Sequence, residues 1–323
     1  MNVEELERHK RVNSMHSALL LLSMTALLMA LGWLLWGLGG AMVALISCVL
    51  IGLIGPRFSP ALVLRMSNAR PLPRHAAEGV HQVFEELARR AELPAVPKLY
   101  YIPSRMLNAF AVGSNHDSAV AVTDGLLRVM NARELTGVLA HEISHIRHHD
   151  TRVMGLADFV SRVLGTISQL GQLLLLISIP MALFGNAMGL GPLQLAAMIF
   201  APLLSTLLQM ALSRSREFTA DLGAVELTAD AAGLASALQK LERIQRGGFW
   251  NTIVPGKRAP VPAALRTHPP TDERIARLGA IAPVPAAHPA PVQRLREMLA
   301  GVTPPSYPRV HVRPRWHLSG LWY

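Results

Sequence analysis

The chain has 323 residues, of which 51% are hydrophobic and only 16% charged, and its mean hydropathy of +0.31 excludes an ordinary soluble enzyme. Aromatic residues make up only 5%, so the apolar excess comes from Leu, Ala, Val, Ile and Met, a composition typical of membrane helices. The net charge of +10 is accompanied by no nucleic-acid-binding motif, so we expect a lipid bilayer with an anionic surface, and no nucleic acid, as its partner.

The first long uncharged stretch covers residues 17–56. A bilayer span needs about 20 apolar residues, so this stretch is long enough to cross twice. The sequence GLGG at 37–40 interrupts it, which predicts a helical hairpin of 17–36 with 41–55 in an N-terminal segment 1–56. A cleaved signal peptide is excluded because no small-residue cleavage site precedes the apolar sequence that follows.

Residues 57–162 form the first polar block, which mixes helix and strand patterns. Apolar residues at helical spacing predict a helix after Pro73: Val80, Phe84 and Leu87. The sequence KLYYI at 98–102 is a strand candidate. NAFAVG–SNHD–SAVAVT at 108–123 consists of two β-prone runs joined by a turn, which predicts a hairpin.

A capping signal starts the last helix of this block. Asn131 is a favourable N-cap, and Glu134 stands three residues later, in the spacing of a capping box. The helix that follows carries the sequence HEISHIRHHD at 141–150. We therefore place this histidine-rich motif on a helix.

The second long uncharged stretch covers residues 163–213, and its break at 185–192 predicts a hairpin of 163–184 with 192–212. Basic residues flank both hairpins and are absent from the connecting tips, so by the positive-inside rule both termini and the polar middle face the cytoplasm. The alternative is a buried hairpin in a globular core, which the glutamines of this stretch leave open: Gln169, Gln172, Gln194 and Gln209.

Residues 214–282 form the second polar block, whose first helix continues from the last predicted span. A further helix is expected at about 231–245, and Pro269 and Pro270 open another. The tail 283–323 is too rich in proline for a helix or sheet. The expected fold is mainly α, α+β. It has two transmembrane hairpins (four spans) and a cytoplasm-facing catalytic domain, built from the two polar blocks, with a small β-hairpin or sheet.

The motif HEISH places His141 and His145 one turn apart on the same helix face, with about 5–6 Å between their Cβ atoms. That separation suits two imidazoles that bind one Zn²⁺. Glu142 lies beside the metal position, where a carboxylate can take a proton from zinc-bound water. The alternatives are a chance match and a helix C-terminus whose dipole favours histidines.

Catalytic zinc needs a third protein ligand and an open position for water. The metzincin pattern is excluded, because it requires Gly and His where this chain has His148 and Thr151. No glutamate lies between Glu142 and Glu217, and Asp221 follows Glu217 by one helical turn. We therefore predict Glu217 as the third ligand and Asp221 as the carboxylate that orients an imidazole.

The membrane pattern supports this ligand set. HEISH lies just before the second hairpin and Glu217 just after it, so a hairpin that crosses twice returns both to one face. The alternative role for Glu217 is a surface salt bridge with Arg214 or Arg216.

Other polar residues near the motif have more than one reading. His148 lies about 10 Å along the helix axis from His141, too far to share an ion with it, so we expect His148 and His149 to be solvated. Asp150 is expected at the helix end or as a hydrogen-bond partner of a ligand. His268, in the sequence THPP, is either structural or stabilises a developing oxyanion.

HEISH, the intervening hairpin, SRSREFTAD and the downstream THPP together resemble the HtpX-type membrane zinc metallopeptidases, which are gluzincins related to the CAAX prenyl endopeptidases. NAFAVG and VTDGLL add to the likeness, which covers about 1–280. It implies zinc on His141, His145 and Glu217, with Glu142 as general base. It also implies cleavage of damaged or misassembled membrane proteins at the cytoplasmic face of the bacterial inner membrane.

We further expect Asp221 and Arg214 to support the ligands. The segment NAFAVG is either a core strand or an edge strand that holds an unfolded polypeptide or membrane-protein substrate by β-addition. In the second case the substrate contacts are the first residues of the segment: Asn108, Ala109, Phe110 and Ala111.

Three other functions are weighed against this one. An intramembrane metalloprotease would carry HExxH within a span, whereas this helix contains Arg133 and Arg147. A CAAX-type processing enzyme would have a larger membrane part than two hairpins. A non-catalytic metal-binding scaffold predicts damage at Glu142 or Glu217, and both are intact.

Overall fold

The computed structural model describes most of the chain: residues 3–54, 60–183, 191–250 and 271–281. His268 and the predicted tail 283–323 lie outside the described residues. The chain divides into two compact units, here named the helical unit (12–57 and 152–215) and the sheet unit (1–11, 58–151 and 216–323).

The helical unit is built from three long helices, each of which has one end in the sheet unit: α1 (Val3–Ile54), α6 (Asp150–Leu183) and α7 (Pro192–Thr228). The continuity of α7 confirms that the second polar block starts on the same helix as the apolar sequence before it. Pro202 lies inside α7 without ending it.

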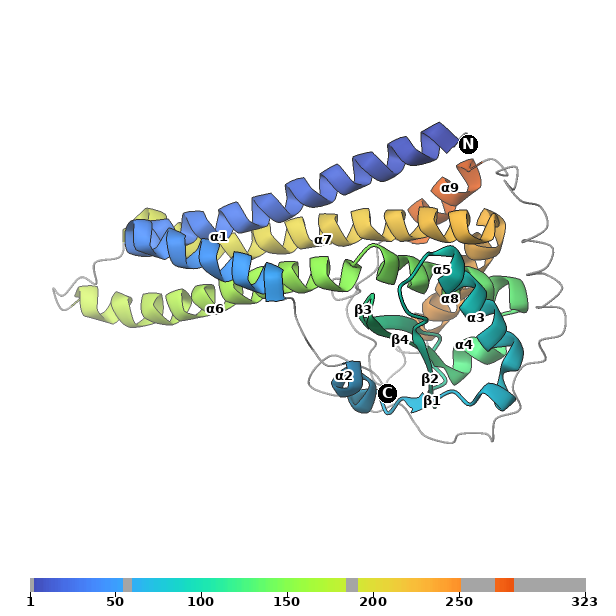
Figure 1. The fold of residues 1–323 in the computed structure, drawn as a ribbon. Coiled ribbons are helices and arrows are strands. Elements are labelled where there is room, and N and C mark those ends of the chain that lie inside the picture. The colour runs from blue at the N-terminus through green and yellow to red at the C-terminus, as the bar shows by residue number, and fades with distance from the viewer. Residues whose placement is uncertain (1–2, 55–59, 184–190, 251–270, 282–323) are drawn as a thin grey trace. The chain divides into compact units, whose positions relative to one another are not determined.

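The helix α1 is a hairpin rather than one rod. Its backbone is non-helical at Trp36 and Gly37, and the φ of 63° at Gly37 lies in the left-handed region that glycine tolerates. A Cβ on Gly32 or Gly40 would collide with the backbone of the other glycine, so the two arms touch, as the reversal of α1 in Figure 1 shows. The break predicted at 37–40 is confirmed.

The helical unit is apolar on the outside as well as inside. Its core contains Met24 and Leu164, both fully buried, while large side chains such as Leu22 and Trp33 are exposed. Among the described residues, two helices are long and apolar enough to cross a membrane, Arg11–Leu53 and Leu193–Thr228. Exposed apolar surface on this scale marks contact with lipid or protein.

The sheet unit contains the remaining elements and one end each of α1, α6 and α7. Its elements in chain order are α2 (Pro60–Met66), β1 (Arg70–Pro71), the short 3₁₀ helix η1 (Arg74–Ala76), α3 (Glu78–Arg90), β2 (Lys98–Ile102), β3 (Ala109–Ser114), β4 (Asp117–Thr123), α4 (Asp124–Val129), α5 (Ala132–Arg147), α8 (Ala231–Trp250) and α9 (Thr271–Ala280).

The strands form one sheet in the order β1-β2-β4-β3. β2 runs parallel to β4, and β3 and β4 are antiparallel, paired from Ala109 with Val122 to Ser114 with Asp117. The predicted strand 98–102 and the predicted hairpin are both confirmed. The sequence did not predict β1, because it is two residues long and depends on pairing with the distant β2.

Alternation along the strands gives the sheet two apolar faces. Val120 and Val122 of β4 join a core with α3, α5 and α8, in which Phe84, Leu139 and Leu234 are fully buried. Ala119 and Ala121 face the other way and pack with Leu64 of α2. The larger core fixes α5, the helix that carries HEISH, against the sheet.

Candidate metal centre

The start of α5 is fixed by the predicted capping box. The Asn131 side chain accepts a hydrogen bond from the backbone N–H of Glu134 at 2.9 Å, and the Glu134 carboxylate accepts one from the Asn131 N–H at 2.9 Å. Lys240 and Ser236 of α8 also donate to this carboxylate. The helix therefore begins at a defined residue, and its first backbone N–H groups have hydrogen-bond partners.

One turn apart on this helix, His141 and His145 turn their Nε2 atoms toward each other at 3.1 Å, with ring centroids 4.6 Å apart. His141 is buried and His145 half-buried. Two imidazole nitrogens that converge in this way suit a shared metal ion.

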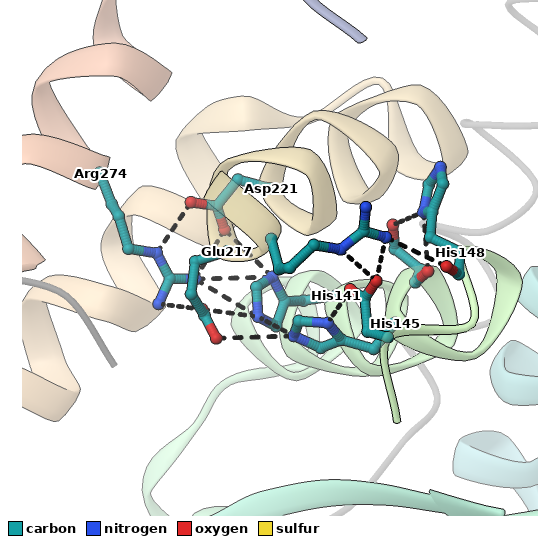
Figure 2. Close-up of polar contacts among 9 residues, drawn as sticks. His141, His145, His148, Glu217, Asp221 and Arg274 are labelled. Atoms are coloured by element: carbon teal, nitrogen blue, oxygen red, sulfur yellow. Dashed lines mark hydrogen bonds and ion pairs between the residues drawn. The ribbon is translucent and has the colours of Figure 1, made fainter. Parts of the chain in front are cut away.

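Glu217 on α7 completes the set. Its Oε2 lies 3.3 Å from His141 Nε2, and its Oε1 lies 3.7 Å from His145 Nε2. One donor atom from each of the three residues lies within 4.8 Å of the others (Figure 2). Two imidazoles and one carboxylate fit a divalent metal ion with an open position. The structure thus brings together the three predicted ligands, and their binding of a metal stays a prediction.

A close approach of α7 to α5 makes this convergence possible. A Cβ on Gly223 would collide with Ser144 Oγ and lie 3.0 Å from Ser144 Cβ. Glycine at this position lets the two helices approach closely less than two turns from Glu217. Glu142, the predicted base, is buried on α5 beside His141.

Asp221 lies where the sequence predicted it, with Oδ1 3.0 Å from His141 Nδ1. Burial lowers the pKa of His141, but the hydrogen bonds with Asp221 and Glu217 outweigh it and raise the pKa to about 10. Burial raises the pKa of Asp221, but its bonds with Arg274 and His141 hold that pKa below the usual range. These contacts therefore favour the protonated form of His141.

Arg274 of α9 is a site residue that the sequence did not reveal. It donates to both Asp221 oxygens, at 2.8 and 2.6 Å, and its NH1 lies 2.9 Å from Glu217 Oε2 (Figure 2). The available signal was spacing, since Arg274 stands one turn before the buried Leu278 on the inner face of a short helix.

The second imidazole has its own carboxylate. His145 donates from Nδ1 to Asp150 Oδ2 at 2.6 Å, which confirms Asp150 as the hydrogen-bond partner of a predicted ligand. Arg216 donates from Nε to Asp150 Oδ1 at 2.5 Å. Arg214 is exposed on α7 and its support of the ligands stays a prediction, whereas Arg216 is 7% exposed and bonded to Asp150.

The neighbouring histidines differ in environment. His148 is half-buried and bonded to Ser144, so its predicted solvation was wrong, and burial lowers its pKa. His149 is exposed, as predicted, with a φ of 55° where the chain turns from α5 into α6. The candidate oxyanion residue His268 lies outside the described residues.

The predicted substrate segment forms β3, an edge strand beside α5. Ala109, Phe110 and Ala111 are half-buried. The backbone carbonyl of Asn108 accepts hydrogen bonds from the N–H and hydroxyl of Thr123, at 3.1 and 2.9 Å. Asn108 is therefore held by β4, and the residues that follow it are those with an outer strand edge.

Comparison with known proteins identifies relatives. Residues 74–282 match the model of "Peptidase family M48". The chain is 36% identical over 293 residues to "Protease HtpX homolog" of Methylibium petroleiphilum, an alignment that covers 84% of this chain and 98% of the relative. It is 37% identical over 284 residues to "Protease HtpX" of Legionella pneumophila, with 84% and 99% covered. A "Protease HtpX homolog" of Pyrococcus abyssi is 36% identical over 283 residues, with 82% and 95% covered.

Proposed function

The chain belongs to peptidase family M48 as an HtpX-type membrane metalloendopeptidase, and on that premise we propose that it uses zinc to hydrolyse misfolded or damaged membrane proteins at the cytoplasmic face of the bacterial inner membrane. The observation that carries the proposal is the convergence of His141, His145 and Glu217 from two helices. Zinc suits this donor set better than calcium or magnesium, which prefer all-oxygen ligands.

When bound, zinc would polarise the scissile carbonyl and activate a water molecule. Glu142 is the proposed general base, which would take the proton from that water and pass it to the leaving amine; its burial on α5 next to His141 supports this role. Asp221 holds His141 at Nδ1 and keeps its Nε2 directed at the metal position. His268 stays a candidate for the oxyanion, and it precedes α9 by three residues.

We place the substrate as an extended segment along β3. An edge strand offers unpaired backbone groups to a polypeptide of any sequence, which suits a protease for unfolded chains. Support comes from the position of β3 at the sheet edge beside α5. The contacts proposed are those of Ala109, Phe110 and Ala111, with Asn108 fixing the start of the strand.

We further propose a multi-pass topology of two hairpins, with the sheet unit and both termini in the cytoplasm. The kink of α1 at Gly37 supports the first hairpin. The basic residues that flank both apolar stretches support the orientation. Between them the hairpins would make four spans.

The test is cleavage of an unfolded polypeptide by the full chain purified in detergent, with zinc content measured for each variant. Glu142→Gln should retain zinc and lose about 10²–10⁴-fold in kcat, because it removes the base without removing a ligand. The matched control is Glu134→Gln, which changes a buried carboxylate on the same helix away from the ligands. Equal cleavage by wild type and Glu142→Gln, or no zinc in wild type, would contradict the proposal.

A further inference from the structure

The two imidazoles of the site differ in what holds them. Asp221 on α7 holds His141, and Asp150, the first residue of α6, holds His145. Asp150 is 3% exposed and Arg216, which binds it, is 7% exposed, so the pair is a buried ion pair behind a candidate ligand. We propose that Asp150 and Arg216 are positioning residues that fix the tautomer of His145 and hold it in register with Glu217. This inference rests on the proposed metal site.

The first step concerns the proton on His145. An ionised Asp150 can only accept, so the contact from His145 Nδ1 to Asp150 Oδ2 requires the proton on Nδ1. The lone pair is then on Nε2, the atom that faces His141 and Glu217. Asp150 thereby selects the only neutral tautomer in which His145 can serve as a ligand at this place.

The second step concerns the other oxygen of Asp150. Arg216 donates to Oδ1 through both Nε and NH2, while Oδ2 is left for His145. An asparagine at position 150 cannot reproduce both bonds, since its NH₂ group would face either the guanidinium or the Nδ1–H. In the first case Arg216 is left buried beside a donor, and in the second His145 changes tautomer.

The third step links the helices. Arg216 NH2 also donates to the backbone carbonyl of His148 at 3.1 Å, just beyond the end of α5. Arg216 is covalently adjacent to Glu217 on α7. The Arg216 guanidinium therefore links the end of α5, which carries His145, to α7 at the position next to Glu217.

Asp150 and Arg216 both lie at boundaries between the two units in the sequence. The chain leaves the sheet unit after Thr151 and returns to it at Arg216. The ion pair between Asp150 and Arg216 therefore connects the two chain segments of the sheet unit that end and begin at these boundaries. The ion pair of Glu134 on α5 with Lys240 on α8 contacts no candidate ligand and provides the comparison.

The experiment measures the zinc dissociation constant of the full chain in detergent by chelator competition, together with the absorption spectrum of the Co²⁺-substituted protein. We expect Asp150→Asn and Arg216→Gln to bind zinc about 10–100-fold more weakly and to alter the Co²⁺ ligand-field bands. Arg216→Lys keeps the charge but cannot contact Asp150 and His148 together, so it should recover part of the loss. Glu134→Gln should change neither reading.

Wild-type zinc affinity and Co²⁺ spectrum in Asp150→Asn and Arg216→Gln, with only a lower Tm, would overturn the inference and leave a structural ion pair. If a single variant does not fold, the double variant Asp150→Asn/Arg216→Gln leaves no uncompensated buried charge, and wild-type affinity there has the same meaning. Absence of zinc from the wild type would instead overturn the proposed function. The two failures are thus distinguishable.

Discussion

At the scale of single residues, the site is a cluster of charged side chains whose protonation would change when a metal ion binds. In the metal-free chain the His141 ring lies between the carboxylates of Asp221 and Glu217, with the guanidinium of Arg274 nearby. The raised pKa of His141 means that these contacts favour its protonated form. A metal ligand must be neutral, so zinc and this proton compete.

We therefore predict that zinc binding strengthens as pH rises from 6 to 8 and releases protons. The metal-free protein keeps the His141 proton until pH approaches about 10, so each pH unit below that value should weaken zinc binding about tenfold per displaced proton. The free energy that protonated His141 contributes to the metal-free fold has the opposite pH dependence: it is fully present below about pH 6.5 and is lost as pH rises through about 10.

Calorimetric titrations in buffers of different ionisation enthalpy count the protons released. Asp221→Asn is the matched variant, because it removes a hydrogen bond that raises the pKa of His141 and should release fewer protons. Zinc affinity that is constant between pH 6 and 8, with no proton release, would contradict this reading of the site.

At the scale of elements, the site depends on how closely α5 and α7 approach. Leucine-rich packing holds many helix pairs at 8–10 Å, and a glycine at the crossing allows a closer fit. Gly223 provides this against Ser144, which is itself fully buried. Arg277 of α9 packs its guanidinium 3.6 Å from the centre of the Phe218 ring, which holds α9 and its Arg274 on α7.

We predict that Gly223→Ala lowers the free energy of unfolding by about 1–3 kcal/mol and weakens zinc binding, because the added methyl group forces α7 away from α5. Gly279→Ala is the control: a Cβ there meets nothing within 4 Å, so the change should be neutral or stabilise α9 by up to about 1 kcal/mol. Chemical denaturation with and without zinc measures both effects. Equal stability and zinc affinity in the two variants would show that the close approach is unimportant.

At the scale of the whole molecule, the chain combines an apolar helical unit with a sheet unit that carries the candidate site. The proposed topology places the tip of α1 outside the cytoplasm and the sheet unit inside. This arrangement can be tested with single cysteines, since the native Cys48 is the only cysteine and is buried.

In a Cys48→Ala background, we predict that Gly39→Cys reacts with a membrane-impermeant maleimide in intact spheroplasts. Arg89→Cys, whose native side chain is 72% exposed on α3, should react only after lysis. Gly39 has open space around its Cα, so a cysteine there fits without strain. Labelling of Arg89→Cys in intact spheroplasts would contradict a cytoplasmic sheet unit.

Local sequence signals predicted the parts of this molecule that depend on neighbours in the chain. The capping box at Asn131, the β3–β4 hairpin and the positions of His141 and His145 all follow from spacings of a few residues. Glu217 was predicted because no other glutamate follows Glu142 before it, and because a hairpin at 163–213 would bring the chain back to the membrane face where HEISH lies.

Long-range pairs could not be found in this way. Arg274 contacts Asp221 from a different helix. Arg216 contacts Asp150 although the whole second apolar stretch separates the two residues in sequence. Arg216 has no local pattern that distinguishes it from the surface arginines nearby, and the spacing of Arg274 from Leu278 indicates a buried helix face but not the carboxylate that Arg274 contacts. For the same reason the sequence did not indicate that Arg216 is buried and Arg214 exposed, since only packing decides this.

The most direct test of the account is a titration of metal-free wild-type protein with zinc, in which bound zinc and cleavage of an unfolded polypeptide are followed in the same sample. The account predicts that cleavage rises in proportion to bound zinc and reaches its plateau at one equivalent per chain, as expected for one site made by His141, His145 and Glu217. Cleavage by the metal-free protein, or one equivalent of bound zinc with no cleavage, would contradict it.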